Sequence, residues 1–212
     1  MDQRPLLISD LDGVLCETAA DGLLWVWWRY GVVVPVRAVR RYAMEHAIAP
    51  ALQASGIDVG PEEVAAELTA SCWSNPAFYR AVRPRSDYWQ ALLRWQARGL
   101  PLQLVTRRTE DLRHATASWL VQHGFAVTGA GPLSARPPLV MNAPKAEVAA
   151  EACASHERVI FVEDAPHHAE AVAAASSAEV WMPAQPWNAD CKVGRRLPAA
   201  ELAEDLVALA ER

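Results

Sequence analysis

From residue 86 onward, short apolar runs alternate with amphipathic stretches, and this alternation restricts the possible folds more than any other feature. Strands that are connected through helices form right-handed crossovers within a parallel sheet. The order therefore predicts an α/β protein with a doubly wound parallel sheet. The expected strands cover residues 100–105, 138–141, 159–162 and 179–182, and the expected helices cover residues 86–98, 110–123, 145–155, 166–176 and 199–210.

An apolar run that starts at Leu6 ends in two aspartates, Asp10 and Asp12, which are followed by Gly13. This pattern predicts a buried first strand that delivers both carboxylates to the carboxyl edge of the sheet, where open α/β folds place their sites. Gly13 permits a sharp turn at no steric cost. The two carboxylates would repel each other unless a cation lay between them, and Mg²⁺ prefers oxygen ligands. A turn without chemical function is the alternative, since Asp and Gly are common turn residues.

Polar side chains also stand at the ends of three later strands or at the starts of the helices that follow. They are Thr106, Lys145 and the pair Glu163 and Asp164. Each has an ordinary alternative role: a strand-end cap for Thr106, a solvated lysine for Lys145, and helix N-terminal charge for the acidic pair. In a parallel sheet all of them would meet at one edge.

These residue types suit phosphoryl transfer. A carboxylate can attack phosphorus and form an aspartyl-phosphate, and a second acid can protonate the leaving oxygen and later help to activate water. A hydroxyl group and an ammonium group can hold the phosphoryl oxygens, while a metal ion neutralises their charge.

In sequence order, these motifs resemble those of the haloacid dehalogenase superfamily of phosphohydrolases, and the resemblance covers nearly the whole chain. It implies that Asp10 is the nucleophile and that Asp12 is the general acid and base. It also implies that Thr106 holds the phosphoryl group and that Lys145 bridges nucleophile and phosphate.

The same resemblance implies a Mg²⁺ ion held by Asp10, the main-chain carbonyl of Asp12, and Asp164, with Glu163 acting through a bound water. A dehalogenase proper lacks the acid two residues after the nucleophile. Asp12 therefore favours phosphate chemistry.

Residues 18–80 show no further strand pattern, and helices are expected in an aromatic segment that holds Trp25, Trp27, Trp28 and Tyr30, and over residues 36–54 and 61–72. We therefore expect an α/β core domain formed by residues 1–16 and 81–212, with a helical cap domain over residues 17–80. The insertion point, the run Phe78-Tyr79-Arg80 and the segment 185–188 resemble the 5'(3')-deoxyribonucleotidase-like branch. This branch implies a nucleoside monophosphate as substrate.

The expected substrate contacts beyond Thr106 and Lys145 are Arg107, Trp28 and Phe78. A guanidinium group suits phosphate oxygens, so Arg107 and its neighbour Arg108 are candidate phosphate ligands, with a solvated position as the alternative. The aromatic residues of the cap would stack on a base, although aromatic side chains on short helices mostly form core.

Two histidines, His167 and His168, follow Asp164 closely. They are candidates for substrate contact or for titration near neutral pH, and the alternative is a place in the first helical turn without a direct role.

The sequence thus predicts a Mg²⁺-dependent phosphatase that hydrolyses a small phosphomonoester through an aspartyl-phosphate, with a 5'-nucleotidase as the more specific candidate. The alternatives are a phosphomutase or phosphotransferase of the same fold, and a non-catalytic nucleotide-binding regulatory module. The expected partner is a small phosphorylated substrate, and both a monomer and a homodimer remain open.

Composition excludes several other classes. A net charge of -5 argues against a nucleic-acid polymer as partner. The most apolar stretch, residues 23–36, is interrupted by Arg29, Gly31 and Pro35 and is too short for a membrane span. The four cysteines include no Cys-x-x-Cys pair, and no signal peptide is apparent, so we expect a cytoplasmic protein with reduced thiols.

Overall fold

A six-stranded parallel sheet forms the centre of the structure, a computed structural model that describes residues 4–125 and 137–211. The strand order is β3-β2-β1-β4-β5-β6, so the chain crosses from one half of the sheet to the other between β3 and β4. This arrangement confirms the expected doubly wound α/β fold. The strands are β1 (Leu6–Asp10), β2 (Leu102–Thr106), β3 (Leu139–Met141), β4 (Val159–Val162), β5 (Glu179–Pro183) and β6 (Arg195–Leu197).

Helices cover both faces of the sheet because alternate residues of each strand point to opposite faces. In β1, Leu7 packs with α5, α6 and α9, whereas Leu6 and Ile8 pack with α7 and α8. These helices are α5 (Ser86–Ala97), α6 (Arg113–Gln122), α7 (Lys145–Ser155), α8 (Pro166–Ala175) and α9 (Ala199–Ala210).

Most of the expected elements of this part are present, with small shifts at their ends. The strand expected at 138–141 forms over Leu139–Met141, and the preceding residues 126–136 lie outside the described residues. The edge strand β6 was not predicted, because only three residues form it and two of them are arginines.

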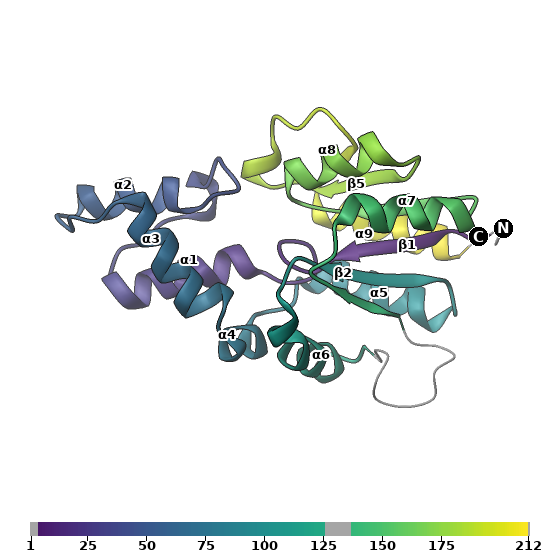
Figure 1. Cartoon of the computed structure of the whole chain (residues 1–212), viewed down its shortest axis with the longest axis horizontal. Coiled ribbons are helices and arrows are strands. Elements are labelled where there is room, and N and C mark those ends of the chain that lie inside the picture. The colour runs from purple at the N-terminus through teal and green to yellow at the C-terminus, as the bar shows by residue number, and fades with distance from the viewer. Residues whose placement is uncertain (1–3, 126–136, 212) are drawn as a thin grey trace.

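A helical segment, residues 18–81, connects β1 to α5 and has its own apolar core. Figure 1 shows its helices beyond the end of β1, to the side of the sheet. Its elements are α1 (Thr18–Tyr30), the 3-10 turn η1 (Val36–Ala38), α2 (Glu45–Ala54), α3 (Pro61–Leu68), the π-helical turn η2 (Thr69–Trp73) and α4 (Pro76–Ala81).

The single helix expected over residues 36–54 is wrong. Only η1 and α2 are helical, and the chain between them forms a loop in which Val39 is buried and Tyr42 is partly exposed. Helix α4 was also missed, although Asn75 caps it through a 2.9 Å hydrogen bond from the main-chain N–H of Ala77 and Pro76 occupies its first turn.

All four cysteines carry free thiols. Within the part of the chain that the structure describes, no helix combines the length and the apolar character that crossing a membrane requires.

Candidate active site

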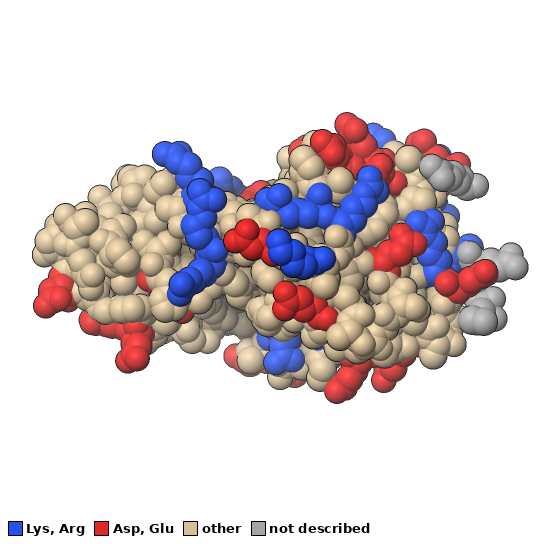
Figure 2. Space-filling view, turned by 90° about the horizontal axis from the view of Figure 1, so that it is seen from above, with Lys and Arg blue, Asp and Glu red and all other residues tan. Residues whose placement is uncertain are grey.

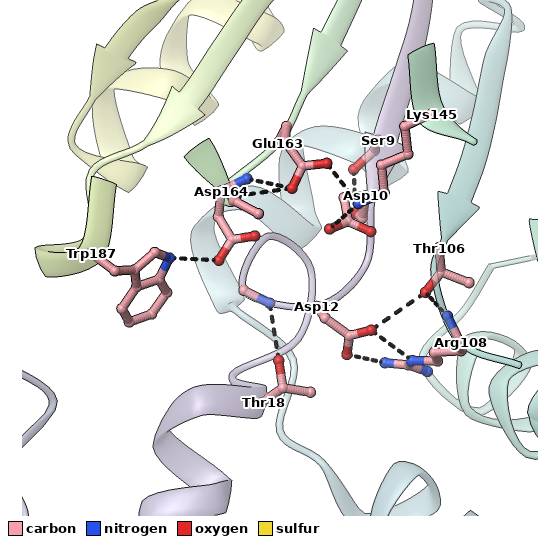
Figure 3. A network of polar contacts seen from close by, with 12 residues as sticks. Ser9, Asp10, Asp12, Thr18, Thr106, Arg108, Lys145, Glu163, Asp164 and Trp187 are labelled. Carbon is pink, nitrogen blue, oxygen red and sulfur yellow. Dashed lines mark hydrogen bonds and ion pairs between the residues drawn. The ribbon is translucent and has the colours of Figure 1, made fainter. Parts of the chain in front are cut away.

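The carboxyl edge of the sheet brings three predicted residues into one buried ion cluster. Asp10 ends β1, Glu163 follows β4, and Lys145 begins α7 after β3. The Lys145 ammonium lies 2.8 Å from Asp10 Oδ2 and 2.6 Å from Glu163 Oε2. Figure 3 shows the three side chains pointing toward one another. Parallel topology therefore joins groups that are far apart in the sequence.

Glu163 has both carboxylate oxygens engaged. Oε2 accepts the bond from Lys145, and Oε1 accepts the main-chain N–H groups of Asp164 and Ala165 at 3.1 and 2.9 Å. These bonds fix the turn that follows β4. They also favour a contact with a metal ion through water over direct ligation.

Burial dominates the electrostatics of the cluster. It raises the pKa of Asp10 to about 8, with Lys145 opposing the shift and Glu163 adding to it. Burial also raises the pKa of Asp164 well above its ordinary value, and Glu163 and Asp10 increase the effect. Burial alone would lower the pKa of Lys145, but Asp10 and Glu163 outweigh it, so that pKa is raised. One ammonium thus stands among three buried carboxyl groups.

The donor set fits a hard divalent cation. Asp10, Glu163 and Asp164 each offer a carboxylate oxygen, and these oxygens lie within 4.8 Å of one another. Oδ1 of Asp10 and Oδ1 of Asp164 are buried and accept no hydrogen bond from the described residues. Buried carboxylate oxygens without partners are costly, and a cation bound between them would remove that cost.

Asp164 is held in place from two sides. Trp187 donates a 3.0 Å hydrogen bond from Nε1 to Asp164 Oδ2, and Asn188 donates one to the Asp164 main-chain oxygen at 3.1 Å. Gly13, with φ +71°, packs so closely that a Cβ atom there would lie 2.0 Å from Asp164 Oδ2. The turn that Gly13 was expected to make is therefore confirmed, and the close approach to Asp164 is a second reason for glycine at this position.

Asp12 points away from the buried cluster and toward β2, as Figure 3 shows. Its two oxygens receive hydrogen bonds from Arg108 Nε at 2.9 Å and Arg108 Nη2 at 2.7 Å. The Thr106 hydroxyl donates to Asp12 Oδ2 at 3.4 Å and accepts the main-chain N–H of Arg108 at 3.2 Å. The two aspartates that come from the first strand thus have different partners.

A cavity of about 390 Å³ opens between the helical segment and this edge of the sheet. Asp12, Gly13, Arg107, Arg108 and Asp164 line it from the sheet side. From the helical segment and the segment after β5, the lining includes four aromatic rings, which belong to Tyr42, Trp73, Tyr79 and Trp187.

The two aromatic residues predicted to contact substrate do not line this cavity. Trp28 is 76% exposed on the outer side of α1, because its helical position faces away from the segment's core. Phe78 packs edge to face against Trp73 and Tyr79, so its ring is partly buried against the core. Sequence reasoning missed Tyr42 because it assigned that region to a helix.

Arg107 lines the cavity and donates a 3.3 Å hydrogen bond to the Asn142 main-chain oxygen. His167 and His168 lie in the first turn of α8, and burial lowers the pKa of His168 to about 4. The ring of His167 packs against that of Tyr42, with centroids 5.2 Å apart.

Comparison with solved structures defines the class of fold as that of haloacid dehalogenase-like hydrolases. One match is a HAD family hydrolase from Deinococcus radiodurans R1, solved with bound phosphate and sodium, with a TM-score of 0.64, 18% identity and coverage of 96% of this chain and 95% of that chain.

Two further matches have the same fold. They are a putative β-phosphoglucomutase from Thermotoga maritima (TM-score 0.59, 16% identity, 96% of this chain and 98% of that chain) and a predicted phosphoglycolate phosphatase from Haemophilus somnus (TM-score 0.53, 13% identity, 97% and 99%). No family model matches the chain, and no curated protein matches it. At such low identities the likeness concerns the fold alone.

Proposed function

We propose that this protein is a metal-dependent phosphatase that hydrolyses a small phosphomonoester through a phosphorylated Asp10. The observation that carries the proposal is the buried cluster at the carboxyl edge, where Asp10 lies 2.8 Å from Lys145 and keeps Oδ1 without a hydrogen bond from the described residues. A carboxylate with one oxygen anchored and the other free is suited to attack phosphorus.

In this mechanism, Asp10 attacks the phosphorus atom, and the bond between phosphorus and the ester oxygen breaks. The leaving oxygen takes a proton from Asp12, which later accepts a proton from the water that hydrolyses the aspartyl-phosphate. Lys145 offsets the charge of the phosphoryl oxygens, and the Thr106 hydroxyl, which donates to Asp12 in the structure, donates instead to one of these oxygens when the ester is bound.

We assign the ion to Mg²⁺, held by Asp10 and Asp164, with the main-chain carbonyl of Asp12 as a further ligand and Glu163 acting through water. The buried Oδ1 of Asp164, which accepts no hydrogen bond from the described residues, supports this assignment, as does the grouping of carboxylate oxygens from Asp10, Glu163 and Asp164 within 4.8 Å of one another. When bound, the ion supplies positive charge that neutralises the phosphoryl group and stabilises the charge developing on it.

Addition of Mg²⁺ is expected to raise the melting temperature, because the ion binds the folded protein and relieves repulsion among its carboxylates. At a concentration of about 100 times Kd the stabilisation is about 2.7 kcal/mol, or roughly 5–10 °C for a chain of this size. Differential scanning fluorimetry with and without EDTA measures it. The variant Asp164→Asn is the control and is expected to lose most of the shift. An equal shift in this variant would remove Asp164 from the metal site.

The activity itself is tested by a panel of phosphomonoesters in the presence of Mg²⁺, with release of inorganic phosphate as the readout. Nucleotides, sugar phosphates and small carboxylated phosphates cover the main leaving groups. A labelled phosphoryl group separates hydrolysis from transfer to another acceptor, as in a phosphomutase or phosphotransferase. Binding of nucleotides without any turnover would favour the non-catalytic alternative.

We further propose a nucleoside monophosphate as the substrate. The cavity has the size of a small-molecule site, and four aromatic rings lie opposite the polar edge of the sheet. Arg107 supplies positive charge at the sheet side. Figure 2 shows that Lys and Arg side chains gather across the middle of one face of the molecule, although the net charge is -5. Local charge of this kind attracts anionic substrates.

The variant Tyr42→Ala tests the aromatic wall. Tyr42 is 46% exposed and lies in a loop, so the substitution removes a ring from the cavity with little loss of core packing. We expect KM for a nucleotide to rise about tenfold, since stacking on a base contributes about 1–3 kcal/mol. KM for a phosphoester without a ring should change little, and Trp28→Ala should leave both values unchanged. Equal effects on both substrates would contradict a base-stacking role.

A further inference from the structure

Arg108 is a buried arginine that lies beside Asp12 and forms an ion pair with it. Only 1% of its side chain is exposed, compared with 23% for Asp12. In addition to its two bonds with Asp12, it donates a 3.1 Å hydrogen bond from Nη1 to the Thr116 hydroxyl and a 3.3 Å bond from Nη2 to the Cys16 sulfur. Its guanidinium group also lies over the Tyr79 ring, 3.9 Å from the centroid.

This environment fixes the guanidinium group rather than leaving it to adapt to a ligand. Contacts from α6, from the turn after β1 and from α4 hold it on three sides. A planar fork that is held in this way can present two parallel N–H groups to a carboxylate, which a lysine ammonium cannot do. Arg108 consequently fixes the orientation of the Asp12 carboxylate.

A general acid acts only if its carboxyl group is aimed at the leaving oxygen. Proton transfer requires an oxygen within hydrogen-bond reach of its target, and small misplacements are costly. The turn over residues 11–16 projects Asp12 into the cavity, where rotation of its side chain would otherwise be free on the solvent side. Arg108 and Thr106 are the described side chains that restrain its carboxylate.

We propose that Arg108 is the positioning residue for Asp12 and that it acts on protonation of the leaving group rather than on binding of the phosphoryl group. The inference rests on the proposed phosphatase function and on Asp12 as its acid. It also distinguishes Arg108 from its neighbour Arg107, which lines the cavity and donates a hydrogen bond to a main-chain oxygen.

Two substrates separate these roles. A p-nitrophenolate group leaves readily without a proton, whereas the alkoxide of an alkyl phosphate requires one. For Arg108→Met, kcat/KM for the alkyl phosphate is expected to fall roughly 100-fold, the scale of general acid catalysis, and that for p-nitrophenyl phosphate by less than about tenfold. Asp12→Asn is expected to show the same ranking. A binding role would instead lower both values equally, mainly through KM.

A double-mutant cycle then shows whether the two residues act together. The variant carrying both Asp12→Asn and Arg108→Met is expected to lose no more activity toward the alkyl phosphate than Asp12→Asn alone. Thr116→Val, which removes only one of the bonds holding Arg108, should give a smaller loss with the same preference. Because Thr116→Val keeps the ion pair between Arg108 and Asp12, it tests the positioning role of Arg108 even if Arg108→Met folds poorly.

Arg158→Gln serves as the matched control. Arg158 forms an exposed ion pair with Glu179 at 2.7 Å, far from the carboxyl edge, and its loss should leave both kcat/KM values unchanged. Equal losses on the two substrates, or additive effects in the cycle, would overturn the inference while leaving the phosphatase proposal intact. Absence of turnover by the wild-type protein on every phosphomonoester would overturn both.

Discussion

Asp10→Asn is expected to reduce phosphomonoester hydrolysis by roughly 10⁴-fold or more, because loss of a covalent nucleophile removes the main reaction path. The amide is isosteric with the carboxylate and retains an oxygen that can accept the bond from Lys145, so the geometry of the cluster should survive. Steady-state release of phosphate measures the loss. Activity within about tenfold of wild type would exclude Asp10 as the nucleophile.

The melting temperature of Asp10→Asn serves as the control for correct folding, and the direction of its change follows from the pKa of Asp10. Burial raises the pKa of Asp10 from 3.8 to about 8. Its contribution to stability is therefore fully present below pH 3.8 and is lost as the pH rises through about 8. Asn is neutral at every pH, so Asp10→Asn should melt at a higher temperature than wild type at neutral pH in EDTA. A large decrease would show that the variant is misfolded and would void the activity test.

Much of the site could be predicted because each of its residues stands at the end of a strand. Asp10, Thr106 and Glu163 occupy or follow the last positions of β1, β2 and β4, and parallel strands bring their carboxyl ends to one edge. Local periodicity was enough to place these strands, since each is short, buried and followed by a helix. The order of the polar residues then restricted the chemistry.

The partners of these residues could not be predicted in the same way. Nothing in the sequence around Arg108 indicates that it would form a bidentate ion pair with Asp12, which lies 96 positions earlier. Tyr42 reaches the cavity only because the chain leaves the helical pattern after residue 38. Trp28 shows the opposite error, since aromatic character alone does not reveal which side of α1 faces inward. Tertiary packing decides the positions of Arg108, Tyr42 and Trp28. The periodicity of a single segment does not reveal that packing.

Lys145→Met is expected to produce the largest loss of stability among these variants. The lysine is 4% exposed, and its ammonium lies 2.8 Å from Asp10 and 2.6 Å from Glu163. Removal of one partner from a buried ion pair costs roughly 3–5 kcal/mol, which corresponds to roughly 6–20 °C in melting temperature for a chain of this size. Activity should fall as well, by roughly 10³-fold, because the described cluster then holds no other cationic side chain to offset the charge of the phosphoryl oxygens.

The double variant Lys145→Met with Glu163→Gln separates charge from packing. The side-chain oxygen of the introduced glutamine can still accept the main-chain N–H groups that Glu163 Oε1 holds now, while one of the two carboxyl groups that Lys145 contacts becomes neutral. Replacement of a buried ion pair by neutral groups of similar volume is often neutral or stabilising, so the part of the lost melting temperature that comes from Glu163 should return. Activity should not return, since the ammonium is still missing. If the double variant were no more stable than Lys145→Met, the uncompensated charge of Glu163 would not account for the loss of stability.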